Sequence, residues 1–397
     1  MKLPLRILAT LGVALAVSAC NAGGSSSMPG AASKSAQGLP LSGRATPVCV
    51  GSRIGQAQCD LLLLPGVEHN TPAGWTPSNL EAAYNLPSSS KGSGQIVAIV
   101  DAYDNPNVAS DLAEYRSYFG LPTANFTKYN QDGQQGNYPE ANQSWGLEID
   151  LDVEMVSASC PNCTIYLIEA NSSSPSDLGT AEAEAVTLGA HIVSNSYSGS
   201  GDDESNYDTP GVTYLASSGD YGYSLYQPAT FDSVVSIGGT LLSKGGGKRG
   251  WTEVVWNIPK DGYATGGGCS SLNETKPSWQ KNPGCKFRTG NDVSAVAWDV
   301  AEYDSYDYAD WVEVGGTSVA SPLLAGVFAL AGNAGSVNGG KAFWTMSSQK
   351  RAKDLFEISS GKNGTCTPKY LCTAGTGEYE DYSGPTGWGT PNGIGAF

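Results

Sequence analysis

Five short runs in this sequence consist almost entirely of apolar residues that favour β-strands. They cover residues 95–100, 164–168, 190–194, 212–216 and 234–237. Strands that are buried on both faces read as continuous apolar runs, and their alternation with helical segments is typical of a parallel sheet. Here the helical segments are residues 107–119 and 181–188. The sequence therefore predicts an α/β domain with a mostly parallel central sheet flanked by helices, and a ligand site at the carboxyl ends of the strands.

The N-terminus has the pattern of an export signal. Two basic residues precede an apolar stretch, residues 7–17, that is far too short to span a bilayer. The stretch leads into Val17-Ser18-Ala19-Cys20, which resembles a bacterial lipobox. We therefore expect a signal peptide at residues 1–20, a lipid anchor on Cys20 and a protein held in the bacterial cell envelope. The alternative is ordinary cleavage after Ala19, which would give a secreted protein.

Composition divides the rest of the chain into three parts. Residues 21–44 are rich in Gly, Ser and Ala and are typical of a flexible tether. Residues 45–79 contain two cysteines and one apolar run, so we expect a small extension packed on a main domain at residues 80–397. The formal net charge of −16 argues against nucleic acid and anionic membrane surfaces as electrostatic partners. We expect a monomer.

The nine cysteines are an odd number, and lipidation of Cys20 would account for one of them. In an oxidising compartment the other eight would form disulfides. Pairing of nearest neighbours predicts Cys49–Cys59, Cys160–Cys163, Cys269–Cys285 and Cys366–Cys372. Cys160-Pro161-Asn162-Cys163 has the form of a redox or zinc motif, but no second pair lies at zinc-site spacing, which favours a structural bridge.

A serine lies in a glycine-rich turn just before a long apolar helix. The segment Gly315-Gly316-Thr317-Ser318 precedes an apolar run at residues 323–331, and Pro322 suits a first helical turn. Glycine lets a substrate backbone come close, and a helix N-terminus attracts developing negative charge. Ser318 is therefore a candidate nucleophile, although a serine here could also be a plain helix cap.

Histidine does not offer Ser318 a base. The chain contains only His69, in the extension, and His191, at the start of a predicted strand. Neither lies in a glycine-rich segment that opens a helix. A Ser-His-Asp triad is therefore not expected.

Carboxylates offer an alternative base. Four of them, Glu148, Asp150, Asp152 and Glu154, alternate with apolar residues. As a strand the segment would place all four on one face, whereas in a helix Glu148 and Asp152 would be neighbours one turn apart and the other two would point elsewhere. Only the helix makes a coupled acid pair; a solvated acidic face is the simpler interpretation.

Two further aspartates follow predicted strands. Asp220, in Ser217-Ser218-Gly219-Asp220, could be a turn residue or, if protonated, a hydrogen-bond donor to an oxyanion. Asp101 ends the first strand, and we expect it to bond to loop backbone rather than to extend a carboxylate network.

Together these segments resemble the sedolisin family, the serine-carboxyl peptidases with a subtilisin-like fold. The resemblance runs from about residue 80 to the end of the chain and rests on motifs in the family's order. They are Glu148…Asp152, Ser217-Ser218-Gly219-Asp220, Gly266-Gly267-Gly268-Cys269-Ser270, Pro277-Ser278-Trp279-Gln280, Asp292-Val293-Ser294-Ala295 and Gly316-Thr317-Ser318 with Pro322. It implies that residues 80–397 form a three-layer peptidase domain, and that the acid pair lies on a helix.

The resemblance also implies a role for each catalytic residue. Ser318 is the nucleophile, Glu148 its general base, Asp152 the partner of Glu148, and protonated Asp220 the oxyanion donor. Activity against protein or peptide substrates is expected in acid, where such carboxyls hold protons. The substrate backbone is expected to add as a strand beside six residues of the cleft. These are Ser194, Ser196, Gly199, Gly266, Gly267 and Gly268.

Two features differ from the family's pattern. The family carries a large prosegment, whereas only residues 21–79 lie between Cys20 and the expected domain. Its calcium site would correspond here to Glu357, Ile358 and Asp381, with one carboxylate missing, so no cofactor is expected for the chemistry and a structural calcium ion is not favoured. The alternative function is a catalytically silent surface-binding protein on the same fold.

Overall fold

The computed structural model describes residues 43–50, 55–66, 70–272, 275–308, 310–337 and 339–397. The predicted signal peptide, Cys20, most of the predicted tether and His69 lie outside the described residues. No helix in the described part of the chain is long and apolar enough to cross a membrane.

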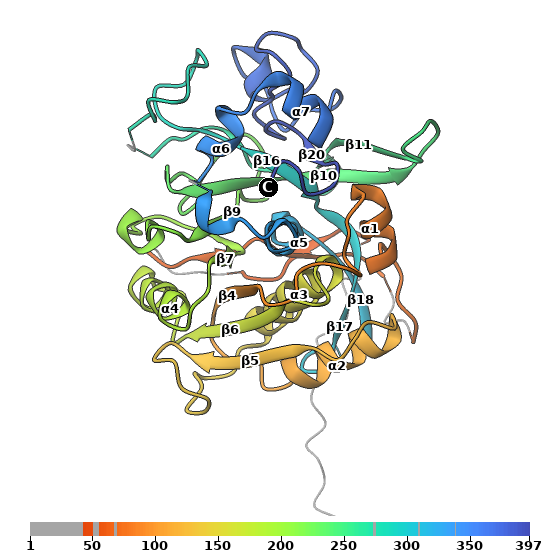
Figure 1. Ribbon diagram of the computed structural model, residues 1–397, viewed down its shortest axis with the longest axis vertical. Helices are drawn as coiled ribbons and strands as arrows, with labels where there is room; N and C mark the ends of the chain where they lie inside the picture. Colours follow the sequence, from red (N-terminus) through yellow and green to blue (C-terminus); the bar gives the residue numbers. More distant parts are fainter. Residues whose placement is uncertain (1–42, 51–54, 67–69, 273–274, 309, 338) are drawn as a thin grey trace, which may run out of the picture. The chain divides into compact units, whose positions relative to one another are not determined.

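A central sheet of eight strands organises the main domain (Figure 1). Its path runs β11-β10-β9-β7-β4-β6-β5, and β16 also pairs with β10. All neighbouring strands are parallel except β10 and β11. The strands are β4 (Ile96–Ala102), β5 (Asn125–Asn130), β6 (Thr164–Ala170), β7 (Ile192–Asn195), β9 (Thr213–Ser217), β10 (Val234–Lys244), β11 (Trp251–Val255) and β16 (Val293–Val296). The predicted α/β class and mostly parallel sheet are confirmed.

Two buried helices, α3 and α5, pack against each other and against the sheet. Helix α5 is apolar on all sides, because it lies between α3 and strands β7, β9, β10 and β16. Helix α4 packs on β4 and β6. The helices are α1 (Pro77–Tyr84), α2 (Val108–Tyr118), α3 (Gln143–Ser159), α4 (Pro175–Thr187), α5 (Thr317–Ala331), α6 (Lys341–Trp344) and α7 (Ser348–Asp354).

The N-terminal extension contributes three short strands to the fold. Strand β3 (Leu62–Leu63) pairs with β1 (Thr46–Pro47) and with β18 (Asp310–Gly315), and β18 pairs with β17 (Trp298–Asp304), all antiparallel. Strand β2 (Gln58–Cys59) pairs antiparallel with β8 (Tyr197–Ser198). The remaining short elements are β12 (Asn257–Ile258), β13 (Tyr263–Ala264), β14 (Gly268–Cys269), β15 (Thr289–Gly290), β19 (Leu355–Phe356), β20 (Thr390–Pro391) and the 3-10 turns Glu204–Tyr207, Ala334–Ser336 and Lys369–Leu371.

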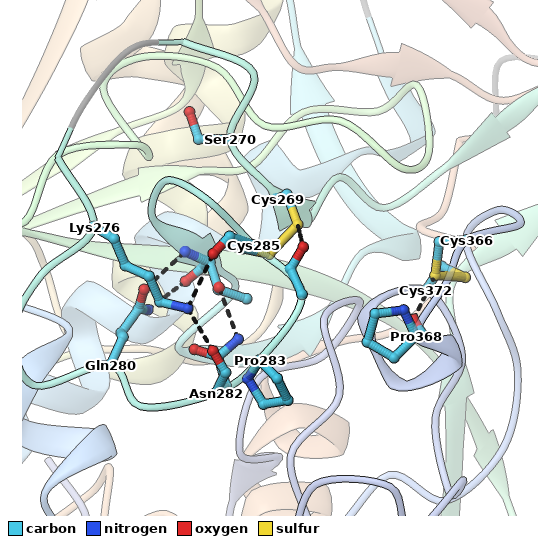
Figure 2. The surroundings of a disulfide bond; sticks show 12 residues. Cys269, Ser270, Lys276, Gln280, Asn282, Pro283, Cys285, Cys366, Pro368 and Cys372 are labelled. Atoms are coloured by element: carbon cyan, nitrogen blue, oxygen red, sulfur yellow. Dashed lines mark hydrogen bonds between the residues drawn. A yellow bond between two sulfur atoms is a disulfide. The ribbon is translucent and has the colours of Figure 1, made fainter.

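All four predicted disulfides are present. Figure 2 shows Cys269–Cys285, which closes the loop that follows Gly268. Inside this loop Gln280 holds Thr289, because its amide donates to the Thr289 carbonyl oxygen (2.6 Å) and accepts from the Thr289 N–H (2.8 Å). The disulfide and this amide together fix the chain on either side of strands β14 and β15.

Candidate functional site

The acidic segment is a buried helix. Helix α3 begins after Asn142, whose side chain accepts a hydrogen bond from the Trp145 N–H (3.1 Å), as expected of an N-cap. Every residue from Trp145 to Ser159 is buried, and all four carboxyls of the segment have 0% exposure. The interpretation as a solvated acidic face is therefore wrong. The helix places Glu148 and Asp152 one turn apart, as the acid pair requires.

Ser318 lies in the first turn of α5. Strand β18 ends at Gly315, Gly316 has φ +130°, and the helix begins at Thr317. The Ser318 hydroxyl donates to the Ser196 carbonyl oxygen (3.1 Å). A side chain at Gly316 would overlap the Asp60 carbonyl oxygen and lie 2.8 Å from Asp220 Oδ2, so only glycine fits this position.

The expectation that Pro322 lies in the first turn of the helix is wrong. Pro322 lies inside the helix. The helix starts earlier than its apolar run, because Thr317 and Ser318 already belong to it. Proline has no N–H for the Ser318 carbonyl oxygen, which is its usual helical partner. That carbonyl oxygen instead accepts from the Ser196 hydroxyl (3.4 Å).

The Glu148–Asp152 pair is set up to share a proton. Burial raises the pKa of Glu148 well above its ordinary value, and the charges of Asp152 and Asp101 raise it further, while the nearby Ser318 hydroxyl lowers it in part. Burial likewise raises the pKa of Asp152, against hydrogen bonds from Ser196 and Glu148 that lower it. The Ser196 hydroxyl donates to Asp152 Oδ1 (2.8 Å), and Asp152 Oδ2 is buried without another donor in the described part of the chain. A proton between the two carboxyls fits this arrangement.

Asp101 is a third member of this carboxyl network. We expected it to bond to loop backbone, but both of its carboxyl oxygens are buried and have no hydrogen-bond partner among the described residues. The expectation is therefore wrong. Burial raises the pKa of Asp101 to about 8, and its charge raises the pKa values of Glu148 and Asp152. The end of strand β4 places it beside α3, a position that the sequence showed but that we assigned to a structural role.

Asp220 has one bonded and one unbonded carboxyl oxygen. Its Oδ1 accepts from the Thr317 N–H (2.8 Å) and the Thr317 hydroxyl (2.9 Å), whereas Oδ2 is buried with no partner in the described part of the molecule. Burial raises its pKa well above the ordinary value, and the charge of Asp60 raises it further. A protonated Asp220 would therefore carry its hydrogen on Oδ2, the oxygen on the Gly316 side of the site.

A segment of the extension occupies the space in front of Ser318. The Ser318 N–H donates to the Asp60 carbonyl oxygen (3.2 Å), and the Asp60 N–H donates to the Ser196 carbonyl oxygen (3.2 Å). Strand β2, just before Asp60, forms an added antiparallel strand beside β8. No sequence signal pointed to Asp60, since the fold alone brings this distant residue to Ser318.

The expected substrate-binding residues separate into groups. Ser196 and Gly199 lie beside the segment, because Ser196 bonds to Asp60 and a Cβ on Gly199 would come 3.3 Å from the Cα of Ala57. Ser194 instead bonds to the Ser321 hydroxyl (3.1 Å), between β7 and α5. Gly266, Gly267 and Gly268 lie close to backbone of the 218–219 and 384 turns, or to Tyr223.

The expected calcium residues do not form an evident carboxylate site. Glu357 and Asp381 are exposed, and Ile358 packs in a small apolar cluster with Val255 and Ala374. Among the described residues no group of three or more His, Cys, Asp or Glu side chains could hold a metal ion. His191 is exposed and its ring bonds to the Gly211 carbonyl oxygen (3.0 Å), consistent with a strand-end position.

Known proteins similar to this chain are peptidases. Residues 131–356, more than half of the chain, match the model of the subtilase family. Sedolisin from Pseudomonas sp. (strain 101) is 27% identical over 365 residues, which cover 81% of this chain and 60% of sedolisin. Kumamolisin from Bacillus sp. (strain MN-32) is 30% identical over 299 residues, which cover 65% of this chain and 52% of kumamolisin. The matched part is thus between half and two thirds of each relative's length.

A solved structure is also similar to this chain. Pseudomonas sedolisin, described as a serine-carboxyl proteinase complexed with two molecules of pseudo-iodotyrostatin, gives a TM-score of 0.66 at 26% identity. The match covers 81% of this chain and 96% of that one. The predicted resemblance to the sedolisins and the subtilisin-like fold are confirmed.

Proposed function

Since this chain belongs to the subtilase family, we propose that it is a serine-carboxyl peptidase that hydrolyses peptide bonds in acid. One observation carries the proposal. The carbonyl oxygen of Asp60 accepts a hydrogen bond from the Ser318 N–H. The unbonded Oδ2 of Asp220 and the buried acid pair lie in the same site. A nucleophile, a base and oxyanion donors around one carbonyl are the parts that acyl transfer needs.

In the proposed reaction Ser318 Oγ attacks the carbonyl carbon of the substrate peptide, and its proton passes to Glu148. The Ser318 N–H and protonated Asp220 donate to the oxyanion of the tetrahedral intermediate. The carbon–nitrogen bond then breaks, and Glu148 returns the proton to the leaving amine. A water molecule hydrolyses the resulting ester by the same route in reverse, which restores Ser318.

Asp152, Ser196 and Asp101 would act through Glu148. Asp152 shares the proton of the pair, and Ser196 orients Asp152 through its hydroxyl. In the structure the Ser318 hydroxyl donates to the Ser196 carbonyl oxygen, so its hydrogen would turn about the Cβ–Oγ bond to reach Glu148. Catalytic hydrogen bonds commonly form only in the complex with substrate.

The test compares the wild-type chain with Ser318→Ala on a denatured protein at a series of pH values. Turnover by the wild type should be highest at about pH 3 to 5 and largely lost at neutral pH, because the acid pair and Asp220 must hold protons. Ser318→Ala should be inactive at every pH. An alkaline optimum would contradict the carboxyl mechanism, and no turnover at any pH would favour the silent binding protein.

We further infer that the protein is exported and anchored by lipid on Cys20. Four disulfides are consistent with an oxidising compartment. The wild-type protein should fractionate with membranes, and Cys20→Ala should alter its processing. A fully soluble wild-type protein whose Cys20 is unmodified by mass spectrometry would contradict the anchor.

A further inference from the structure

The segment that contains Asp60 is held by strand pairing both before and after one peptide bond. Before the bond, Gln58 pairs with Ser198 and Cys59 with Tyr197. After it, Leu62 pairs with Gly315 and Leu63 with Val314 on strand β18. The bond between them is Asp60–Leu61, and its carbonyl oxygen accepts from the Ser318 N–H (3.2 Å). The chain's own residues therefore lie as a peptide substrate would lie in strand addition.

The side chain of Asp60 fills a small polar pocket beside this bond. Residue Asp60 is 3% exposed. The Ser198 hydroxyl donates to its Oδ1 (2.8 Å), and the Ser217 hydroxyl donates to its Oδ2 (2.7 Å). Ser198 lies on β8 and Ser217 ends β9, so the two hydroxyls come from two different strands. Both carboxyl oxygens thus have a hydroxyl donor, one from β9 of the central sheet and one from β8, the strand that pairs with β2.

We propose that Ser198 and Ser217 form the pocket for the substrate residue whose carbonyl is attacked, and that they select aspartate there. The proposal rests on the proposed function. An apolar side chain would leave the buried Ser217 hydroxyl and the half-buried Ser198 hydroxyl without this partner, and a lysine would bring an unpaired charge into the site. A glutamate is one methylene longer, which a closely packed pocket accepts poorly.

Acid conditions suit this pocket. Burial raises the pKa of Asp60 to about 7, although the bonds from Ser217 and Ser198 lower it in part. Asp220 and Glu148 lie near this carboxyl, and the charge of Asp60 raises the pKa of each of them. Below that pH an aspartate enters as the neutral acid, so no charge is added beside the carboxyls of the site. Asparagine has the same shape as neutral aspartate but does not titrate, so the binding of a substrate with asparagine at this position should depend less on pH.

The experiment uses the full chain and a set of peptides that differ only at the residue before the cleaved bond. We expect kcat/KM for the aspartate peptide to exceed that for the leucine and lysine peptides at least about tenfold, the value of one lost hydrogen bond. The asparagine peptide should be cleaved at a rate close to that of the aspartate peptide in acid, and its rate should fall less as the pH rises. Equal rates for aspartate and leucine would overturn the proposal.

The same peptides test the two serines. Ser217→Ala and Ser198→Ala should each lower the aspartate-to-leucine ratio by about tenfold, whereas a merely structural role would lower both rates together. Ser217→Thr keeps the hydroxyl and should restore most of the ratio. Ser336→Ala, which removes an exposed hydroxyl that bonds to Asn333, is the matched control and should leave the ratio unchanged. An unchanged ratio in both pocket variants would overturn the assignment.

A second measurement uses the chain's own occupant. Asp60→Leu should loosen the segment and raise the rate on the added aspartate peptide several-fold, while Asp60→Asn should stay close to the wild type in acid. Equal rates in Asp60→Leu and Asp60→Asn would contradict the pocket's preference. A chain that degrades denatured protein with no preference for aspartate overturns this proposal alone, whereas a chain that cleaves nothing at any pH overturns the proposed function with it.

Discussion

Helix α3 carries two pairs of carboxyls on different faces, and only one pair has a nucleophile beside it. Glu148 and Asp152 lie near Ser318 and Ser196. Asp150 and Glu154 lie instead toward helix α2 and strand β17. All four are fully buried, and burial raises the pKa of each well above its ordinary value.

The second pair belongs to a cluster that ties loops together. Asn105 donates its amide to Asp150 Oδ2 (2.7 Å), and the Tyr303 N–H donates to Glu154 Oε2 (3.2 Å). Asp111, Glu302 and Asp304 add three more buried or partly buried carboxyls to this cluster. Asp304 Oδ1 accepts backbone N–H groups of its own loop, those of Asp307 and Tyr308 (both 2.7 Å).

The difference between the two faces shows which observations support the proposed catalytic role of Glu148. Burial and a raised pKa are common to both, so they identify no function by themselves. Glu148 differs in its surroundings, which contain the Ser318 hydroxyl at a helix N-terminus, the Asp152 carboxyl one turn away and the carbonyl group of Asp60. The same contrast allows paired variants, in which a substitution on the face with Asp150 and Glu154 is the control for the same substitution on the face with Glu148 and Asp152.

The largest contrast should come from Glu148→Gln and Glu154→Gln. At acid pH Glu148→Gln should lower kcat/KM by about a thousandfold, because the amide cannot accept the Ser318 proton. Glu154→Gln should stay within about threefold of the wild type, because it faces no reacting atom. Peptide hydrolysis by both variants, with folding checked by circular dichroism, measures this. Equal losses would show that the base is assigned to the wrong face.

Asp220→Asn should have the next largest effect. An amide N–H is a weaker hydrogen-bond donor than a carboxylic acid O–H, so kcat should fall by about a hundredfold at the acid optimum. An amide donates without needing a proton, so the residual activity should fall less steeply toward neutral pH than the wild type's does. A pH–rate profile from pH 2 to 8 measures the slope. A profile that keeps the wild-type slope would remove Asp220 from the acid requirement.

The free energy of unfolding should fall as the pH rises, and the carboxyl cluster around Asp150 and Glu154 should contribute to this decrease. The carboxyls of both faces have pKa values raised by folding, so the native state holds protons that the unfolded chain loses above about pH 4. Their stabilising effect is complete below that pH and is lost as pH rises toward the raised values. The Tm should therefore be higher at pH 4 than at pH 7.

Glu302→Gln tests the contribution of the cluster in the same measurement, at a position where the charges of Asp304 and Asp152 both raise the pKa of Glu302. Both Glu302 oxygens are buried without a partner in the described residues, so ionisation is costly there. The variant should raise the Tm at pH 7 by at least about 2 °C and change it little at pH 4, where the neutral acid and the amide are alike. Glu114→Gln, at an exposed position of α2, is the control. A Tm that rises from pH 4 to 7 would contradict the interpretation.

The smallest effect is expected from removing single hydrogen bonds to the two faces of α3, the bond from Ser196 to Asp152 and the bond from Asn105 to Asp150. Ser196→Ala removes the hydroxyl that lowers the pKa of Asp152, so the acid pair should keep its proton to a higher pH. The upper limb of the pH–rate profile should move up by roughly half a unit to one unit. Asn105→Ala removes the bond to Asp150 and should lower stability without moving the profile. A shift in Asn105→Ala instead would couple the two faces.

The sequence allowed most of the sheet and the acid pair to be predicted, because these depend on local pattern. The apolar runs identified β4, β6, β7, β9 and β10, and four local cysteine pairs identified the disulfides. The helix around Glu148 and Asp152 needed the family resemblance, since apolar and acidic residues alternate as in a strand. That alternation survives in a helix here because every face of α3 is buried.

The contributions of Asp60, Asp101 and Pro322 could not be predicted in the same way. Asp60 reaches Ser318 only because β2 and β3 pair with strands more than a hundred residues away in sequence. For Asp101 the sequence predicts bonding to backbone, because an aspartate side chain readily accepts from N–H groups of a nearby loop. Pro322 was placed in a first turn because the apolar run starts after it, whereas the polar Thr317 and Ser318 already belong to the helix.

The segment that lies against Ser318 is covalently part of the chain, which changes how protein concentration affects its binding. Residues 58–63 continue into the protein in both directions, so the segment is present once per site at any dilution. A tethered ligand of this kind has an effective concentration on the order of millimolar. Dilution of the protein therefore does not release the segment. An added peptide must compete with the effective concentration of the segment, so its binding depends on its own concentration and on its affinity.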